Sequence, residues 1–476
     1  MRMNVLAIDQ GTSSTKALVL SPEGSILGAA EAPVHPRAFG DGAVEQDPEE
    51  LFASVLEAGR QALARSGAPI GAVGVANQGE TVLAWDRGND QPLTAAISWQ
   101  DRRATSVCKR LAAHGARLQA LTGLPLDPYF AAPKMRWLRE HVTRDGVCTT
   151  TDAWLLHRLT GAYVTDAATA SRTALLELDA VRWSPETCAL FEIDPNTLPA
   201  IVGCAEPVGE TTVFGGRVPV AGLAVDQQAA LFAEGCFGDG EAKCTYGTGA
   251  FLLATVGTRA VRSTAGLVSC VAWQLAGETT YCVDGQVYTV GAAVDWLRRI
   301  GLVHDVTDLD AVGTQVADCA GVVFVPSLAG IAAPFWRPNA RGVFVGLSLA
   351  TERAHLIRAV IEGISAQVAL LARSVAADIG RPLARLRVDG GLTRSRTLMQ
   401  MQADLLQMPV EVYPSPHATA VGVAALARLG VGFAKSPGDA IGEWQPAAVF
   451  EPRTRADEAE SRLHRWRQVA EATMNL

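Results

Sequence analysis

The sequence lacks the features that mark several large classes of protein. Its nine cysteines are scattered and no two form a CxxC pair, which is typical of reduced thiols in a cytosolic protein. No apolar run approaches the roughly 20 residues that a membrane span requires, and the first residues carry no apolar signal-peptide segment. The formal net charge is -8, so the chain has no excess of basic residues with which to bind nucleic acid. These absences favour a cytoplasmic protein that binds neither nucleic acid nor a membrane.

Two other absences concern phosphate binding and domain layout. The chain contains neither GxxxxGK[ST] nor GxGxxG, the glycine-rich motifs of two common nucleotide-binding folds. It also contains no exact repeat, long linker or low-complexity segment. At roughly 100–250 residues per domain, the 476 residues predict two or three domains. The glycine-rich stretch 235–240 is the expected boundary, which divides the chain into 1–235 and 236–476.

The first part of the chain predicts a β-hairpin or meander followed by a capped helix. Its short apolar segments are separated by polar turns, the first of them at residues 9–16. Asp47 as N-cap, Pro48 at the first helical position and the carboxylate of Glu50 predict a helix that ends near Gly67. The strands expected here are residues 5–8, 17–20, 25–29 and 70–76.

The rest of the chain again predicts strands that are separated by polar or glycine-containing turns and followed by helices. Residues 244–255 predict two strands that are separated by Gly247-Thr248-Gly249, and 355–379 predict a long amphipathic helix. The other elements expected are a strand at 218–225 with a helix opening at Gln227, a strand at 386–388, and a helix from about Ser395 to Leu406.

The segment Asp9-Gln10-Gly11-Thr12-Ser13-Ser14-Thr15-Lys16 brings together the groups that phosphate binding needs. Its small residues let backbone N–H groups approach phosphate oxygens, its hydroxyls donate hydrogen bonds, and Lys16 supplies positive charge. Asp9 can hold Mg²⁺ through the water shell of the ion. Taken alone, a polar hairpin turn explains the segment equally well.

Two further turns of this kind occur later, at Tyr246-Gly247-Thr248-Gly249 and at Asp389-Gly390-Gly391. Each alone is better explained as a tight turn that glycine permits. However, actin-like ATPases build their nucleotide cleft from this combination: a phosphate-type turn in each half and a Gly-Gly pair at the end of a strand. The combination predicts an α/β protein with the two-domain actin-like ATPase (ribonuclease H-like) fold, an interdomain cleft, and ATP with Mg²⁺ as ligands.

At this point the sequence resembles the FGGY carbohydrate kinases, and within that family the glycerol kinases, over nearly its whole length. The resemblance is carried by Leu126-Asp127-Pro128-Tyr129-Phe130 with Lys134 and Trp137, by Asp226-Gln227-Gln228-Ala229-Ala230-Leu231, by 246–251, and by Gly342, Phe344, Gly346 and Leu347 followed by His355, Ala359 and Glu362. It implies in-line phosphoryl transfer from MgATP to a small polyol or sugar.

The resemblance also implies roles for individual residues. Asp226 is implied as the catalytic base, although a simple N-cap aspartate is the usual explanation at a strand-to-helix junction. The implied polyol pocket consists of Glu80, Trp99, Tyr129, Asp226, Gln227 and Phe251. Each aromatic residue of this set could instead be ordinary core packing. The implied nucleotide site consists of Thr12, Ser13, Lys16, Gly247, Thr248, Gly291, Asp295, Gly391 and Ser395, with Asp9 as the metal-binding residue.

Several positions depart from the family pattern. Gly79 stands where glycerol kinases usually carry Arg just before the glutamate, so a cation and its side-chain volume are both missing. Lys16 stands where Arg is common, Asp295 where Gln is expected, and Ala131 where Ser, Thr or Pro is usual. Residues 214–220 lack the extended glycine-rich loop that carries allosteric sugar-phosphate control in some bacterial glycerol kinases.

Two alternatives to a glycerol kinase therefore remain. The first is a kinase for a longer polyol or a ketose (a tetritol, pentitol or pentulose), because the absence of Arg at position 79 leaves room for a larger substrate. The second is an actin- or chaperone-like ATPase that binds a protein, which would not need the polyol set. A homodimer or homotetramer is possible in either case.

Overall fold

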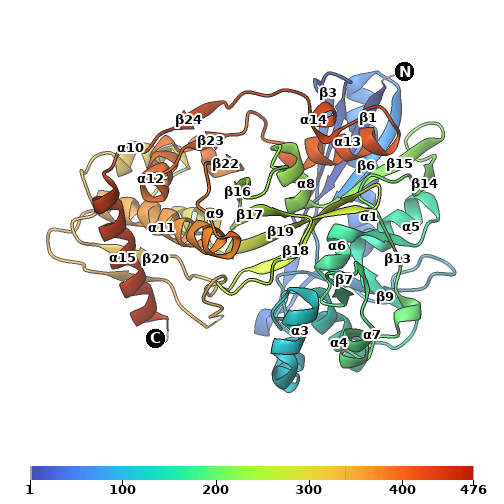
Figure 1. Ribbon diagram of the computed structural model, residues 1–476, viewed down its shortest axis with the longest axis horizontal. Helices are drawn as coiled ribbons and strands as arrows, with labels where there is room; N and C mark the ends of the chain where they lie inside the picture. The colour runs from blue at the N-terminus through green and yellow to red at the C-terminus, as the bar shows by residue number, and fades with distance from the viewer. Residues whose placement is uncertain (1–2, 338, 475–476) are drawn as a thin grey trace.

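The computed structural model describes residues 3–337 and 339–474, and its two largest sheets are formed by different parts of the chain. The strands of one sheet lie within residues 4–225, and those of the other within 242–450. Figure 1 shows the first sheet at the upper right and the second sheet to its left. The chain is an α/β protein with the two-domain architecture that the sequence predicts.

The first sheet starts as the predicted meander, in which β1, β2 and β3 pair antiparallel in chain order. Strands β1, β6 and β15 run parallel beside it. The first polar turn is shorter than predicted, because Asp9 pairs with Lys16 and Gln10 with Thr15, which leaves only residues 11–13 as the turn. The strands, in spatial order, are β14 (Gly209–Thr211), β15 (Val218–Val225), β6 (Ile70–Asn77), β1 (Asn4–Gln10), β2 (Ser14–Leu20) and β3 (Ile26–Pro33).

Helix α1 (Pro48–Ser66) packs against β1, β2 and β3. It starts as predicted: the Asp47 carboxylate accepts a hydrogen bond from the Glu49 backbone N–H at 2.9 Å, and Gly67 ends the helix in the left-handed conformation. The carboxylate of Glu50 takes no part in the cap. It binds the His35 ring nitrogen at 2.5 Å instead, and this bond lowers the pKa of Glu50.

Helix α13 (Ala418–Gly430), from the late part of the chain, packs against β1, β6 and β15 of the first sheet. Gly74 and Gly222 are register partners on these strands. A Cβ atom on either would lie only 2.5 or 2.4 Å from the Val423 carbonyl oxygen of α13. Glycine at both positions therefore allows the helix backbone to approach the sheet closely, and residues distant in sequence share one core.

The second sheet contains most of the strands predicted after residue 240. Strands β16 and β22 run parallel, and the turn Gly247–Gly249 joins β16 to the antiparallel β17 as expected. In spatial order the strands are β18 (Val268–Leu275), β19 (Glu278–Val287), β17 (Ala250–Gly257), β16 (Ala242–Tyr246), β22 (Leu386–Asp389), β23 (Val410–Val412) and β24 (Ala448–Phe450).

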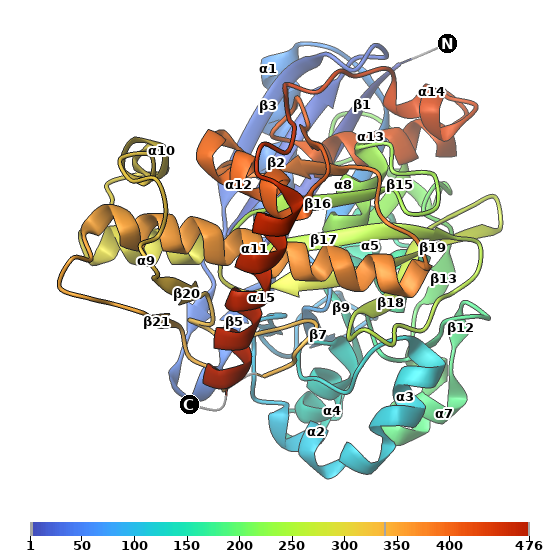
Figure 2. The same ribbon diagram turned by 60° about the vertical axis from the view of Figure 1, so that its left-hand side comes forward.

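Helix α11 (Arg353–Ile379) is the long helix predicted at 355–379, and it crosses the second sheet (Figure 2). Contrary to the expectation from sequence, it is long and apolar enough to cross a membrane by those two criteria alone. However, 78% of its apolar window is buried inside the protein, where it packs against β17, β19 and β20. The helix is apolar because it forms the centre of the second core.

The remaining elements complete both halves and a smaller region beside the first sheet. The additional strands are β4 (Arg37–Ala38), β5 (Val44–Gln46), β8 (Ala96–Ile97), β7 (Val82–Trp85) and β9 (Val147–Thr150) in one sheet, and the pairs β10 (Val164–Asp166) with β13 (Ala200–Val202), β11 (Leu176–Glu177) with β12 (Arg182–Trp183), and β20 (Val323–Val325) with β21 (Val343–Val345). The additional helices are α2 (Thr105–Arg110), α3 (Gly115–Thr122), α4 (Ala131–His141), α5 (Thr151–Thr160), α6 (Ala167–Ser171), α7 (Pro185–Leu190), α8 (Asp226–Ala233), α9 (Gly291–Arg299), α10 (Thr307–Gly313), α12 (Arg396–Leu406), α14 (Pro437–Ile441) and α15 (Ala456–Thr473).

Candidate active site

The candidate site is built where three parallel strands of the first sheet end side by side. The last residues of β1, β6 and β15 are Gln10, Asn77 and Val225, and these three are register partners across the sheet. The chain segments that follow them therefore meet at one edge, which is where α/β sheets bind ligands. Those segments are the turn 11–13, the loop 78–80 and the start of α8, each of which contains residues predicted from the sequence.

A backbone hydrogen bond closes the turn after β1, and the turn contacts the part of the site that is predicted to bind the acceptor. Gly11 N–H donates to the Ser14 carbonyl at 3.0 Å, and Ser13 is exposed. The Thr12 hydroxyl accepts a hydrogen bond from the indole nitrogen of Trp99 at 2.9 Å. One residue predicted to contact phosphate thus touches one predicted to contact the polyol, so the two predicted sites adjoin.

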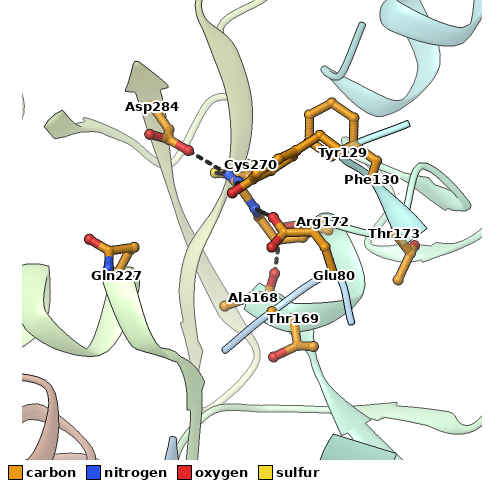
Figure 3. A network of polar contacts seen from close by, with 12 residues as sticks. Glu80, Tyr129, Phe130, Ala168, Thr169, Arg172, Thr173, Gln227, Cys270 and Asp284 are labelled. Atoms are coloured by element: carbon orange, nitrogen blue, oxygen red, sulfur yellow. Dashed lines mark hydrogen bonds and ion pairs between the residues drawn. The ribbon is translucent and has the colours of Figure 1, made fainter. Parts of the chain in front are cut away.

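The loop after β6 turns sharply at two consecutive left-handed residues, Gly79 (φ 56°) and Glu80 (φ 49°). The turn is fixed by Asn77, whose side-chain oxygen accepts from the Gly79 N–H at 2.9 Å. A left-handed residue other than glycine is uncommon and clusters at functional sites. Here the turn directs the buried Glu80 carboxylate toward Arg172 and Tyr129 (Figure 3).

The structure corrects the expectation that Gly79 leaves an empty space. A Cβ atom on Gly79 would lie 2.7 Å from Cγ2 of Val225, the last residue of β15. Since that distance is shorter than a van der Waals contact, the methyl group of Val225 already fills the space next to Gly79. Both the backbone conformation and the neighbouring side chain therefore favour glycine at this position.

Asp226 is the first residue of α8, and the N-cap of that helix is Val225, so Asp226 is not the N-cap. Its carboxylate accepts from the Gln227 backbone N–H at 2.7 Å. The Gln227 side-chain oxygen in turn accepts from the buried Lys243 ammonium, also at 2.7 Å. Burial raises the pKa of Asp226, and the Lys243 charge opposes that rise. The carboxylate is thus a stronger proton acceptor than an exposed aspartate.

Three aromatic side chains gather on the acceptor side of the site. The ring of Trp99 lies 5.7 Å from that of Tyr129 and 6.3 Å from that of Phe251, centroid to centroid and edge to face. Phe251 comes from β17 of the second sheet, so both halves of the chain contribute to this wall. The buried Lys134 ammonium donates to the Tyr129 and Phe130 carbonyls, which fixes the segment that carries Tyr129.

The second sheet presents a similar edge. Thr245 and Asp389 are register partners on β16 and β22, so the turn 247–249 and Gly390-Gly391 lie together. The start of α9 packs on this turn, since Gly291 N–H donates to the Gly247 carbonyl and Ala292 N–H to the Thr248 carbonyl, each at 3.0 Å. The Thr248 side chain and Gly391 are exposed. These groups are therefore open to a ligand.

The two edges face each other closely enough for their charges to interact. Burial, together with the carboxylates of Asp226 and Asp389, raises the pKa of Asp9 to about 7, while Lys16 lowers it. The negative charges of Asp226 and Asp389 thus act on Asp9, and a bound cation would relieve that repulsion. The described residues contain no cluster of three or more metal-ligating His, Cys, Asp or Glu side chains. The donor set fits Mg²⁺, which protein sites usually hold by one or two carboxylates together with substrate phosphates.

The structure separates the last two predicted nucleotide residues. Asp295 is exposed on α9, pairs with Arg298 at 3.2 Å, and lines a hollow of about 370 Å³ with Val306 and Arg394. Ser395, by contrast, is buried: its hydroxyl caps α12 by accepting from Leu398 N–H and donates to Asp310 at 2.7 Å. The Ser395 side chain thus has a structural role, whereas Asp295 borders an open hollow.

Other residues at the site carry no local sequence signal. Arg172 and Lys243 are single cations outside any recognisable motif, and Val225 has the pattern of an ordinary strand residue. Arg172 contacts Glu80, which lies 92 residues earlier, and Lys243 contacts Gln227, which lies 16 residues earlier. A buried cation is costly unless it is paired, so only the strong burial of these segments could have drawn attention to them.

The comparisons with known proteins agree with this geometry. Residues 4–233 match the N-terminal domain, and residues 242–430 the C-terminal domain, of the FGGY family of carbohydrate kinases. The chain is 44% identical to a glycerol kinase of Bordetella parapertussis, covering 98% of this chain and 96% of that protein. It is 41% identical to a glycerol kinase of Myxococcus xanthus, covering 98% of each.

A solved structure gives the same result for the fold. The crystal structure of Plasmodium falciparum glycerol kinase with ADP superposes with a TM-score of 0.92 at 30% identity, covering 99% of this chain and 98% of that one.

The fold and the site define a phosphotransferase that uses ATP and acts on an alcohol group of a small polyol or sugar. The chain belongs to the FGGY family of carbohydrate kinases.

Proposed function

We propose that this kinase transfers the γ-phosphoryl group of MgATP to a terminal hydroxyl of glycerol, with Asp226 as the general base. The observation that carries the proposal is the position of Asp226 at the edge shared by the phosphate-type turn and the aromatic acceptor pocket. The relatives named glycerol kinase support the choice of substrate. In phosphoryl transfer the protein contributes mainly positioning and charge stabilisation.

The acceptor would lie between the aromatic rings of Trp99, Tyr129 and Phe251, with its hydroxyls on Glu80 and Gln227. The rings exclude water from the carbon skeleton, while the carboxylate and the amide bind hydroxyls. Asp226 would take the proton from the attacking hydroxyl. Because water could also accept the phosphoryl group, closure of the two domains over both substrates would prevent wasteful hydrolysis.

The nucleotide would bind across the two edges. The turns that contain Thr12, Ser13, Gly247 and Thr248 offer backbone N–H groups and hydroxyls to the phosphates, and Lys16 adds positive charge. Gly291, Asp295, Gly391 and Ser395 would border the base and ribose, Ser395 through its backbone alone. Asp9 would hold Mg²⁺, which when bound neutralises phosphate charge. We further propose a cytoplasmic enzyme.

We choose glycerol over a longer polyol because the relatives are named glycerol kinase. The longer substrate depended on free space beside position 79, and a Val225 methyl group already lies where a Cβ atom of residue 79 would be. The second alternative, an actin- or chaperone-like ATPase that binds a protein, is inconsistent with membership of a carbohydrate kinase family.

A coupled ADP-release assay across polyols and ketoses of three to six carbons tests the choice of substrate. We expect the highest kcat/KM for glycerol, with erythritol lower by about 10–200-fold, the discrimination that one extra carbon unit typically gives, and the five-carbon xylulose lower still. A higher kcat/KM for any four- or five-carbon acceptor would instead favour the longer-polyol alternative.

Asp9→Asn tests the metal assignment. Loss of a carboxylate that holds an ion through its waters typically costs about 10–100-fold in metal affinity, so the Mg²⁺ concentration that gives half-maximal activity should rise by this factor. Glu31→Gln is a matched control, because Glu31 also acts on Asp9 by its charge but hydrogen-bonds Ser14. An equal Mg²⁺ requirement in both variants would contradict the role of Asp9.

A further inference from the structure

Behind the acceptor pocket, one buried guanidinium lies between two buried carboxylates (Figure 3). Arg172, directly after α6, donates from Nε to Glu80 at 2.5 Å and from Nη1 to Asp284 of β19 at 2.7 Å. Its Nη2 lies 3.4 Å from the Tyr129 hydroxyl. All four residues are at least 96% buried. A single cation thus contacts both the polar and the aromatic group proposed to bind the acceptor.

The second-sheet side of this network borders the same pocket. Gln286 and Asp284 lie on one face of β19, and the Gln286 amide donates to Asp284 at 3.0 Å. Gln286 is the direct register partner of Phe251, the aromatic wall contributed by β17. Directly opposite residues of an antiparallel pair share a face, so the network continues beneath Phe251.

The network has hydrogen-bonding capacity left over. One oxygen of Asp284 and the side-chain oxygen of Gln286 are buried without a hydrogen-bond partner. Such atoms are rare in folded proteins, and each needs an explanation such as a ligand or a water. Two carboxylates on one guanidinium also leave an excess negative charge, which favours hydroxyl donors in the space beside them.

We propose that Arg172 is a positioning residue for the acceptor: its guanidinium binds Asp284 and Glu80 at the same time, so that the Glu80 carboxylate is held in the orientation that binds a substrate hydroxyl. This inference rests on the proposed function, because it takes Glu80 to be a polyol ligand. The planar fork of arginine can bind two carboxylates at fixed angles, whereas lysine, a point charge, cannot. The hydrogen bond to Asp284 keeps the Arg172 guanidinium from rotating away from Glu80.

The electrostatics of Glu80 support this role. Burial raises the pKa of Glu80 to about 7, while Arg172, by charge and by hydrogen bond, and Lys134 of α4 lower it; Asp226 of α8 raises it. Burial, and after it the charge of Glu80, raises the pKa of Tyr129 as well. Removing the Arg172 charge would therefore raise the pKa of Glu80 further. Binding that needs the ionised carboxylate would then be lost at neutral pH and regained only at higher pH.

The competing explanation is that Arg172 only ties α6 to the second sheet. Such a tie would affect folding, but it would not make acceptor binding depend on Glu80. A double-mutant cycle separates the two explanations, because residues that act through one another are non-additive.

The experiment measures glycerol binding by calorimetry from pH 6 to 9, and ATP binding and thermal stability in parallel, for the parent, Arg172→Lys, Glu80→Gln and the double variant. We expect Arg172→Lys to weaken glycerol binding about tenfold, and to weaken it hardly at all in the Glu80→Gln background. Arg172→Met should in addition move the midpoint of the pH dependence upward. ATP affinity should stay near that of the parent.

Arg428→Lys is the matched control, since Arg428 is a buried arginine that bonds the Ser21 and Ala440 carbonyls instead of the pocket. It should lower thermal stability without changing the pH dependence of glycerol binding. If Arg172→Lys weakened glycerol binding equally in both backgrounds, the positioning role would be wrong. If the parent bound no polyol and phosphorylated none, the proposed function itself would fail, which is a separate outcome.

Discussion

Asp226→Asn is expected to lower kcat for glycerol phosphorylation by about 10²–10⁴-fold, the usual contribution of a general base. Asparagine has nearly the same shape, and its side-chain oxygen can still accept from the Gln227 backbone N–H. It cannot, however, take a proton from the attacking hydroxyl. Calorimetric titration should show ATP affinity close to that of the parent, because Asp226 is assigned to the acceptor and not to the nucleotide.

The pH dependence gives a second test of the same residue. A general base must be deprotonated, so kcat should fall as pH falls through the pKa of Asp226. Burial places that pKa above the usual range for aspartate, with the Lys243 charge opposing the shift. The acidic limb of kcat should therefore lie at higher pH than for an exposed aspartate, and it should be absent from the residual activity of Asp226→Asn.

A matched control for burial is Asp152→Asn. Asp152 is another buried aspartate whose pKa is raised by burial, to about 6, but its carboxylate accepts from the Thr165 hydroxyl and from no residue proposed to bind a substrate. Its substitution should alter thermal stability and leave kcat near the parent value. Should Asp226→Asn keep more than half of the parent turnover while folded, Asp226 would not be the base.

Sequence patterns correctly predicted those helices and strands whose formation depends on residues close together in the sequence. The strand at 218–225 lies where it was expected, and the helix predicted from Asp47 and Pro48 starts and ends at the predicted residues. Both follow from local rules, namely apolar runs bounded by turns and a capped helix start. The glycine and threonine turns also lie at strand ends as predicted, because they interrupt apolar runs.

The contacts that depend on distant segments could not be predicted in this way. Arg172 meets Asp284 across 112 residues of sequence, and nothing near either residue indicates the pairing. Helix α13 packs on the first sheet although it lies after most of the second, because Gly74 and Gly222 admit its backbone. The predicted role of the Ser395 hydroxyl meets a similar limit, since Asp310 from another helix engages it.

Position 79 shows how such a contact changes a prediction about specificity. From the sequence, glycine in place of arginine indicated room for a larger substrate. In the structure the Val225 methyl group lies where a new Cβ would go. The single substitution Gly79→Arg combines a left-handed arginine, which costs roughly 1–2 kcal/mol, with overpacking, which costs about 1–3 kcal/mol.

Gly79→Arg alone should therefore destabilise the protein by about 2–5 kcal/mol and abolish most activity, because the strained loop carries Glu80. Gly79→Ala is the matched control: it adds only the Cβ atom, so it should show nearly the same loss of thermal stability. Adding Val225→Ala to either variant removes the methyl group that the new Cβ atom would meet. It should therefore recover the part of the lost stability that is due to overpacking.

The double variant Gly79→Arg with Val225→Ala then tests whether arginine at this position sets substrate choice. Two donors to substrate hydroxyls, each worth about 0.5–1.5 kcal/mol, should raise the ratio of kcat/KM for glycerol over erythritol by roughly tenfold to a hundredfold. The comparison is made against Val225→Ala alone, which enlarges the pocket without adding a donor and should lower the ratio. If the double variant folds and its ratio is no higher than that of Val225→Ala, the residue before Glu80 does not determine which acceptor is used. Acceptor specificity would then be determined by Glu80 itself and by the network behind it.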